Sequence, residues 1–252
     1  MGLFGWGKKN KKVDGNFPPL NLANLQVDIH SHLIPGIDDG ARNMDESIAM
    51  LAKFESLGYR KVVTTPHIMS DYFKNTPETI LGGLENVREL AARLGLKIQI
   101  DAAAEYYYDE SLMSRLKREE KLLTFDDNYL LFEYSMHSEP DNTEALIFEM
   151  TTRNYKPVIA HFERYPYYHG SVDKAKELRE NGVFVQLNMN SLTGHYGPAI
   201  KKQAELMVDQ NVIDFVGSDC HRMDHLINIE KHLTFEYFHK LESLSLVNRS
   251  LK

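Results

Sequence analysis

Short apolar runs alternate along this chain with longer segments in which apolar positions recur at helical spacing. The runs are rich in Val, Ile, Leu and Tyr, and several stay apolar at consecutive positions, as strands buried on both faces do. This pattern predicts strands at residues 25–30, 60–65, 97–103, 128–134, 156–161, 183–188 and 212–218. The amphipathic segments predict helices at residues 43–57, 77–94, 141–153, 171–182 and 198–210.

Residues at the segment ends support these assignments. Asn43 and Thr76 stand where a side-chain oxygen can cap the first free backbone N–H groups of a helix. Gly58, Gly95 and Gly182 stand just past three helix ends, where a left-handed backbone is favoured. The chain therefore consists of about seven strand–helix units.

The arrangement of these units follows from their polar residues, because side chains suited to metal binding stand at the ends of many of the strands. A doubly wound sheet also alternates strands and helices, but it gathers ligands at one switch point. Ligands collected from many strand ends favour a barrel. We expect a distorted (β/α)7 TIM-like barrel in one domain at residues 21–252, preceded by a flexible basic tail at residues 1–20.

Composition narrows the class of protein. A chain of 252 residues with 42% hydrophobic and 26% charged residues is typical of one soluble domain. The net charge of −7 argues against general nucleic-acid binding. One cysteine permits no intramolecular disulfide and fits a reducing cytoplasm. No apolar run approaches the roughly 20 residues that span a bilayer.

The start of the chain places Phe4 and Trp6 before a cluster of lysines. This order does not fit a secretory signal, in which positive charges precede a longer apolar stretch. We interpret the segment as a solvated tail, and a weak contact with a membrane surface or a partner is the alternative.

Candidate metal ligands follow the first and the last predicted strands. His30 and His32 follow the first, and Asp219 and His221 follow the last. Because side chains at i and i+2 of a strand point the same way, the members of each pair share one face. Asp28 lies on the face of the first pair, where it can orient a ligand.

Further candidates come from the strands between these two. Glu105 ends a strand of small residues and is suited to bridge two cations, and His67 and His161 follow two other strands. Asp39 lies in Asp38-Asp39-Gly40, which is either a simple turn or a loop folded over the site. Most of the remaining histidines are expected to be surface or packing residues: His137, His169, His195, His225, His232 and His239.

Imidazole and carboxylate ligands without thiolates suit Mn, Fe, Zn or Mg. Such cations about 3.5–4 Å apart can activate a water molecule as a nucleophile. Arg164 stands three residues after His161, and its guanidinium matches the geometry of phosphate. The sequence thus predicts hydrolysis of a phosphate monoester. A cysteine-dependent route is excluded, because Leu226 stands where Cys220 would need an arginine.

Six stretches in order, at residues 27–40, 64–67, 104–108, 131–136, 157–165 and 217–221, match a known pattern. On them the chain resembles the polymerase-and-histidinol-phosphatase (PHP) superfamily. Within it, the chain resembles the bacterial manganese-dependent tyrosine-protein phosphatases of capsule and exopolysaccharide loci. The His-Ser-His…Asp-Asp-Gly opening together with His-x-Glu-Arg-Tyr is specific to this subfamily.

The resemblance implies a distorted (β/α)7 barrel with three divalent cations, Mn²⁺ in this family. Arg164, Asp39 and His221 are the implied catalytic residues. The implied ligands are His30, His32, Glu105 and Asp219 for one cation, Glu105, His67 and His161 for the second, and Asp39 and His221 for the third.

The resemblance leaves substrate binding open. Arg164 looks like the phosphate-binding arginine, but the second family arginine, in a Gly-Arg-Pro-like stretch, has no direct counterpart here. Either Arg222 takes over that role, or the pocket binds phosphate with one arginine. Tyr106 and Tyr165 either flank an aromatic substrate ring or pack beneath the rim.

The function implied by the resemblance is hydrolysis of protein phosphotyrosine, on a membrane-associated bacterial tyrosine kinase that controls polysaccharide export. The expected location is the cytoplasm, with attachment at the inner membrane through the partner as an open possibility. A small-molecule phosphatase, such as one for histidinol phosphate, and a non-catalytic regulator of the kinase are the alternatives. The proton for the leaving group comes either from an aspartate or from a metal-bound water.

Overall fold

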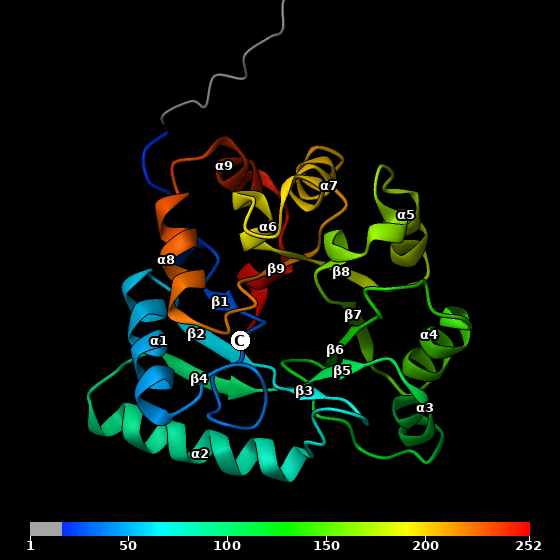
Figure 1. Cartoon of the computed structure of the whole chain (residues 1–252), viewed down its shortest axis with the longest axis horizontal. Helices are drawn as coiled ribbons and strands as arrows, with labels where there is room; N and C mark the ends of the chain where they lie inside the picture. The colour runs from blue at the N-terminus through cyan, green and yellow to red at the C-terminus, as the bar shows by residue number, and fades with distance from the viewer. Residues whose placement is uncertain (1–16) are drawn as a thin grey trace, which may run out of the picture.

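Parallel strands lie in the middle of the protein, and helices surround them (Figure 1). This computed structural model describes residues 17–252. The strands are β1 (Val27–Asp28), β2 (Lys61–Thr64), β3 (His67–Ile68), β4 (Gln99–Ala102), β5 (Glu105–Tyr107), β6 (Tyr129–Glu133), β7 (Lys156–Ile159), β8 (Phe184–Asn188) and β9 (Phe215–Gly217).

The strands form two parallel sheets, in the orders β1-β2-β4 and β3-β5-β6-β7-β8-β9. The predicted strands at residues 60–65 and 97–103 correspond to β2 and β4, and each is followed, after a break of two residues, by a short strand that was not predicted, β3 and β5. Proline has no N–H to donate to a strand ladder, which explains the first break. If β2 and β3 count as one position of the barrel and β4 and β5 as another, the described residues have seven strand positions, as predicted.

Backbone hydrogen bonds beyond β1 and β9 bring the two ends of this curled sheet together. Ser31 forms a parallel bridge with Cys220. The N–H of Asp219 donates to the carbonyl of His30 at 2.8 Å, and the N–H of His32 donates to the carbonyl of Cys220 at 2.9 Å. The predicted distorted barrel is therefore confirmed, and its seam joins the first and last candidate ligand pairs.

The five predicted helices are present, with ends within three residues of those expected. Asn43 caps its helix by accepting from the N–H of Glu46 at 3.0 Å. Four further helices were missed because they have only five to nine residues, too few to show a clear helical repeat. The helices are α1 (Met44–Ser56), α2 (Pro77–Arg93), α3 (Glu110–Lys117), α4 (Thr143–Thr152), α5 (Asp173–Glu180), α6 (Met189–Thr193), α7 (Pro198–Asp209), α8 (Met223–Lys231) and α9 (Glu236–Ser243).

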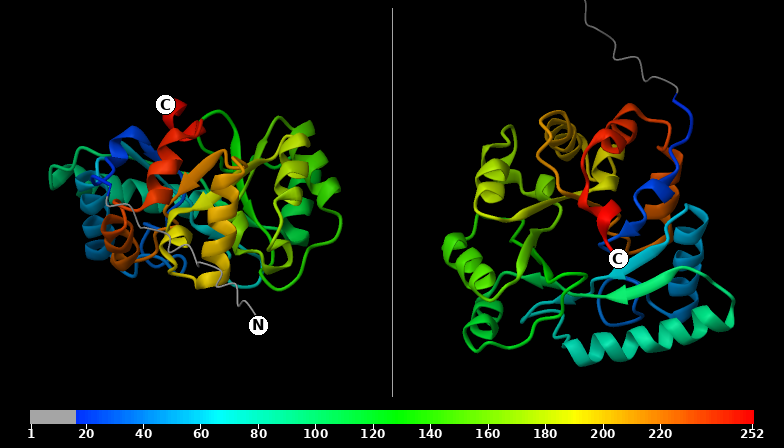
Figure 2. Two further views of the ribbon diagram at one scale, coloured as in Figure 1. Left: turned by 90° about the horizontal axis from the view of Figure 1, so that it is seen from above. Right: turned by 180° about the vertical axis from the view of Figure 1, so that it is seen from behind.

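Apolar side chains from the strands form a small core of their own, separate from the larger layer between strands and helices. Leu251 belongs to this core, and the C-terminus lies in the middle of the ring of strands when the protein is seen from behind (Figure 2). Arg60 and Lys61 donate to the carbonyls of Leu251 and Lys252 at 3.1 and 2.8 Å. The members of this core are Val27, Ile29, Val63, Ala103, Phe125, Tyr129, Leu131, Val158, Ala160, Phe215 and Leu251.

The folded part begins before residue 20. The ring of Phe17 stacks on His239 with centroids 4.8 Å apart, and the N–H of Leu20 donates to the carbonyl of Leu233 at 3.0 Å. The predicted end of the tail at residue 20 is therefore wrong, because residues 17–20 pack against the C-terminal helical region. Phe4, Trp6 and their lysines lie outside the described residues. Among residues 17–252, no helix is long and apolar enough to cross a membrane.

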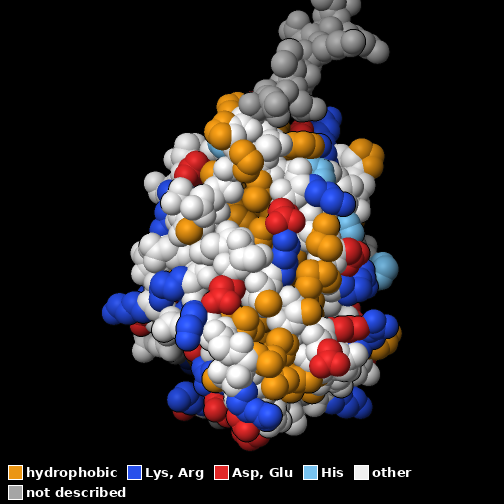
Figure 3. All heavy atoms as spheres, turned by 90° about the vertical axis from the view of Figure 1, so that its left-hand side faces the viewer, with side chains coloured by type: hydrophobic (Ala, Val, Ile, Leu, Met, Phe, Trp, Pro, Cys, Tyr) orange, Lys and Arg blue, Asp and Glu red, His pale blue; other side chains and the backbone are white. Residues whose placement is uncertain are grey.

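On the face that carries α1 and α8, charged side chains of both signs are interspersed with apolar ones (Figure 3). Arg42 pairs with Glu46 at the start of α1, and Lys53 of α1 donates to Glu230 of α8 at 2.5 Å. These pairs are exposed enough that each contributes little stability, about 0–1 kcal/mol.

Candidate metal centre

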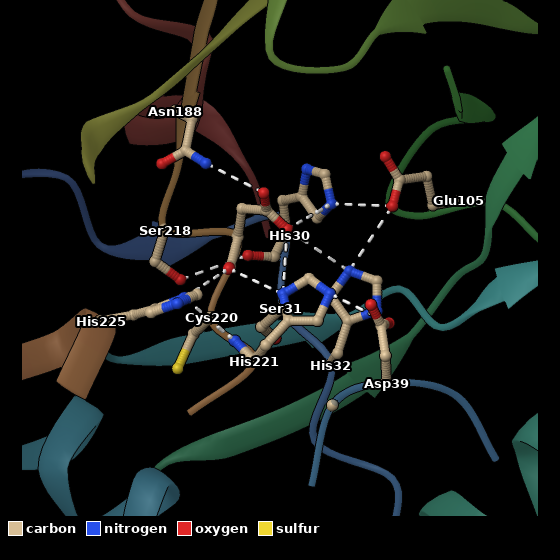
Figure 4. Close-up of polar contacts among 12 residues, drawn as sticks. His30, Ser31, His32, Asp39, Glu105, Asn188, Ser218, Cys220, His221 and His225 are labelled. Carbon is tan, nitrogen blue, oxygen red and sulfur yellow. Dashed lines mark hydrogen bonds and ion pairs between the residues drawn. The ribbon is translucent and has the colours of Figure 1, made fainter. Parts of the chain in front are cut away.

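The side chains expected to bind metal lie together at the carboxyl-terminal end of the barrel, and Figure 4 shows five of them, His30, His32, Asp39, Glu105 and His221. All of the expected ligands except His30 and His32 line a cavity of about 320 Å³. His67 begins β3 and Glu105 begins β5, just past the breaks in those strands, while His161 follows β7 and Asp219 follows β9. The seam of the barrel adds His30, so distant parts of the chain meet in one place.

Glu105 lies at the centre of this cluster. One carboxylate oxygen, Oε2, lies 3.1 Å from both His30 Nε2 and His67 Nδ1, and 3.5 Å from His32 Nε2. The other oxygen, Oε1, lies 3.0 Å from His161 Nε2. Burial would raise the pKa of Glu105, but the neighbouring charges of His30 and His67 outweigh it and hold that pKa well below its usual range. Glu105 is therefore an anion shared by four imidazoles.

Asp219 joins the cluster to the arginine. Its Oδ1 lies 3.4 Å from His30 Nε2 and 3.3 Å from His221 Nδ1. Its Oδ2 accepts hydrogen bonds from Arg164 Nη1 at 3.0 Å and from Asn188 Nδ2 at 2.9 Å. One oxygen of this buried carboxylate thus faces imidazoles of the cluster, and the other holds Arg164, the candidate phosphate-binding group.

The loop before α1 folds over the cluster, which decides between the two interpretations of Asp38-Asp39-Gly40. Asp39 Oδ1 lies 3.2 Å from His221 Nε2 and 3.5 Å from His67 Nε2. Asp38 is more deeply buried, and its Oδ2 lies 2.8 Å from His32 Nδ1. Sequence analysis assigned no role to Asp38, although it fixes the ring of a candidate ligand.

Gly40 allows this loop to touch His32. A Cβ at position 40 would lie 2.3 Å from the carbonyl oxygen of His32 and 2.4 Å from its Cβ. We expect Gly40→Ala to lower the free energy of unfolding by about 1–3 kcal/mol, as overpacking of a filled site does. Gly82→Ala in α2 is the matched control, because no atom lies within 4 Å of its added Cβ. Denaturant unfolding should show the control stabilised by up to about 1 kcal/mol; equal effects of the two variants would contradict the steric argument.

The second nitrogen of most of the rings is fixed by a polar neighbour. His30 Nδ1 lies 3.0 Å from Gln186 Oε1, which also accepts from the N–H of His161 at 2.9 Å. Such a contact sets the orientation of a metal-binding imidazole and leaves its other nitrogen free for the cation. Asp28 was expected to orient a ligand ring, but it accepts instead from the backbone N–H of Ser218 at 3.1 Å. Because β1 ends at Asp28, strand alternation does not continue to His30.

The donor set fits divalent cations. His32 Nε2 and His67 Nδ1 are buried and face carboxylates, yet neither makes a hydrogen bond of acceptable geometry. Buried nitrogens of this kind are normally paired, and cations held between them and the carboxylates would satisfy them. Ligand atoms lie within 4.8 Å of one another in three groups: His32, Asp39, His67 and His221; His30, His32 and Asp219; and His67, Glu105 and Glu133.

Similar proteins show to which family the chain belongs. The family model for capsular polysaccharide synthesis, CpsB/CapC, matches residues 26–229. The chain belongs to this family.

Members of the family resemble the chain over most of their length. The tyrosine-protein phosphatase CpsB of Streptococcus pneumoniae is 30% identical over 203 residues, covering 79% of this chain and 84% of that protein. The putative tyrosine-protein phosphatase CapC of Staphylococcus aureus is 30% identical over 225 residues, covering 86% and 87%.

Solved structures of other proteins have folds similar to that of this chain. Among crystal structures of YwqE from Bacillus subtilis and CpsB from Streptococcus pneumoniae, described as metal-dependent tyrosine phosphatases, one chain matches with a TM-score of 0.74 and 26% identity. The match covers 90% of this chain and 96% of that chain. A lactonase from Listeria monocytogenes matches with a TM-score of 0.55 and 13% identity, which is a likeness of fold alone.

Glu133 is a further residue of this site that the sequence analysis missed. It ends β6, and its oxygens lie 3.3 Å from His67 Nδ1 and 3.6 Å from His161 Nε2. The signal was present, because Glu133 ends an apolar strand as the other candidates do. Two histidines set aside as surface or packing residues, His195 and His225, also line the cavity. Cys220 points away from the cluster, with its sulfur 3.6 Å from that of Met50 (Figure 4).

Tyr106 and Tyr165 are buried and do not line the cavity. The hydroxyl of Tyr106 accepts from the N–H of Leu123 at 2.7 Å, and that of Tyr165 accepts from the N–H of Tyr134 at 3.0 Å. Tyr106 follows Glu105 on β5, so its side chain points to the opposite face of the strand. The expectation that these two rings bind substrate is therefore wrong, and the packing alternative is right.

The two arginines differ in how firmly they are held. Arg164 lies over the ring of Tyr196, with its guanidinium carbon 4.6 Å from the ring centroid, and it bonds Asp219. Arg222 also lines the cavity, but its side chain is 65% exposed and its Nε lies 3.6 Å from Asp224. Arg164 is thus preorganised at the cluster, whereas Arg222 stands at the rim.

Proposed function

We propose that this protein is a metal-dependent phosphomonoesterase that hydrolyses phosphotyrosine in proteins. The observation that carries the proposal is the placement of Arg164 and the Glu105-centred cluster on one cavity, joined through the carboxylate of Asp219. A phosphate that reaches this cavity meets both a guanidinium fork and a site for cations. The names of the relatives in the CpsB/CapC family support the same activity.

The residues that would hold the cations are the predicted ligands together with Glu133. Bound divalent cations supply positive charge for the phosphate and activate a water molecule at neutral pH. We propose Mn²⁺ as the resident metal, because nitrogen and carboxylate ligands without thiolates suit it. The proposed ligands are His30, His32, Asp39, His67, Glu105, Glu133, His161, Asp219 and His221.

Side chains of the protein carry out the other steps, which are binding the phosphate and contacting the reacting group. Arg164 binds the phosphate oxygens, and Tyr196 holds its guanidinium in place by stacking. Asp39 and His221 face each other at the more exposed edge of the cluster, and we propose that both contact the reacting group. The leaving phenolate has a parent pKa of about 10, so it needs less help from an acid than an alkoxide does.

We propose that the physiological substrate is a membrane-associated bacterial tyrosine kinase that controls polysaccharide export, and that the reaction takes place in the cytoplasm. The family's description as capsular polysaccharide synthesis proteins supports this choice. Arg222 at the rim is proposed to meet the substrate in place of the second family arginine.

Removal of the metal tests the function directly. We expect phosphate release from a phosphotyrosine peptide to stop after treatment with a chelator and to return when Mn²⁺ is added, with Fe²⁺, Zn²⁺ and Mg²⁺ compared beside it. Histidinol phosphate serves as the second substrate. Release from histidinol phosphate alone would establish a small-molecule phosphatase, and release from neither substrate would favour the non-catalytic regulator.

A further inference from the structure

A tight hairpin follows β3 at the edge of the cavity. Ile68 pairs with Lys74 in an antiparallel bridge, and the N–H of Met69 donates to the carbonyl of Phe73 at 2.9 Å. Residues 70–72 therefore form the tip. We refer to residues 69–73 as the 69–73 hairpin.

The inner side of this hairpin is apolar. Met69 and Phe73 line the cavity together with Met136, whereas most of the other lining groups are charged side chains or imidazoles. The ring of Phe73 stacks on His67, with centroids 5.4 Å apart and planes 13° from parallel. An apolar surface beside the cation ligands suits the ring of an aryl phosphate, because the ring loses contact with water there.

Two side chains fix the hairpin to the barrel. Asp109 accepts from the N–H of Ser70 at 3.0 Å through one oxygen, and its other oxygen caps α3. Asn75, just after the hairpin, donates to the carbonyls of His67 and Ile37 at 2.9 Å. Because both ends are anchored, the apolar wall is held in place before any substrate arrives, which lowers the entropic cost of binding.

The outer side of the hairpin presents Tyr72. Its side chain is 79% exposed, more than that of any other large hydrophobic residue in the described part of the chain. A single exposed aromatic is normal on a protein surface. Tyr72 differs because it belongs to the same hairpin as Met69 and Phe73, which line the cavity. Tyrosine is one of the residues enriched among the side chains that dominate binding at interfaces.

We propose that both sides of the 69–73 hairpin contact the substrate. Phe73 and Met69 contact the ring of the phosphotyrosine, and Tyr72 contacts an apolar residue that flanks the phosphotyrosine in an extended peptide. An extended chain advances about 3.3 Å per residue, so the residues that flank the phosphotyrosine stay close to it. This assignment rests on the proposed phosphotyrosine activity and adds to it a preference for phosphotyrosine within a peptide.

The test compares free phosphotyrosine with a phosphotyrosine peptide that has leucine or valine at the flanking positions. For Tyr72→Ala we expect kcat/KM on the peptide to fall about tenfold, mainly through KM, as for loss of a binding hot spot. Turnover of free phosphotyrosine should stay unchanged. The matched control is Phe148→Ala, which removes an aromatic side chain that is 64% exposed on α4 and absent from the cavity lining. It should change neither substrate.

Phe73→Leu tests the inner side, because it keeps an apolar side chain but removes the flat ring. We expect kcat/KM to fall for both substrates while the metal content, measured on the purified variant, stays at the wild-type level. Equal losses on both substrates for Tyr72→Ala, or no loss on the peptide, would overturn the assignment. Absence of turnover of both substrates by the wild-type protein would instead contradict the proposed function itself.

Discussion

Glu105→Gln is expected to abolish phosphate release and to leave the purified protein with much less bound divalent metal. Among residues 17–252, Glu105 is the one carboxylate whose two oxygens together face four imidazoles, those of His30, His32, His67 and His161. Glutamine has nearly the same shape, but it carries no charge and presents one N–H₂ donor to nitrogens that need an acceptor or a cation.

The expected effect on kcat is a loss of about 10³-fold or more, since the charge stabilisation that bound cations supply amounts to several kcal/mol. Metal analysis of the purified variant and turnover of the phosphotyrosine peptide measure the two effects. Glu144→Gln on the exposed side of α4 is the control and should change neither. Wild-type metal content with wild-type turnover in Glu105→Gln would contradict the central role of this carboxylate.

Arg164→Ala is expected to lower kcat/KM on the phosphotyrosine peptide by about 10²–10³-fold, as loss of a preorganised donor to a transition state does. Burial lowers the pKa of Arg164, and the charge of Asp219 outweighs this and raises it, so the guanidinium is always charged. The ring of Tyr196 lies beneath this guanidinium, with its centroid 4.6 Å from the guanidinium carbon. Alanine removes this group and leaves the cation ligands in place.

Arg164→Lys separates charge from geometry. Lysine keeps the charge but has no planar fork, so we expect it to recover only part of the activity. Metal content should stay at the wild-type level in both variants, which distinguishes phosphate binding from cation binding. Arg179→Ala is the control, because Arg179 also pairs with an aspartate, Asp214 at 2.9 Å, but lies outside the cavity lining. Unchanged turnover in Arg164→Ala would contradict the assigned role.

Strand and helix periodicity predicted the order of elements well wherever an element was long. The helix at 43–57 was recognised from its repeat and from Asn43, and α1 indeed begins at Met44. Helix α6, with five residues between β8 and α7, has no room for a repeat and was missed. Strand β3, with two residues after Pro66, was also missed, because the predicted strand ended at residue 65.

The candidate ligands were predicted from a single rule, that polar residues directly after apolar strands gather at one end of a parallel barrel. The rule placed His67, Glu105 and His161 correctly beside one another. It applies equally to Glu133, which ends β6 in the same way and was overlooked. Strand alternation, had it been applied to Tyr106, would have placed that ring away from Glu105.

The sequence by itself determined the parallel barrel, because apolar periodicity, helix caps and left-handed glycines are local properties of the chain. It also determined which side chains lie at the end of the barrel, since a strand end has a fixed place in such a fold.

Only the tertiary structure decided which partners each of these side chains contacts. The two oxygens of Asp219 face different partners, Asp38 rather than Asp28 orients a ligand ring, and Tyr196 supports Arg164. The sequence likewise did not predict the 69–73 hairpin, which Asp109 anchors. These contacts join residues far apart in the chain, and their geometry depends on the packing of whole elements rather than on any local pattern.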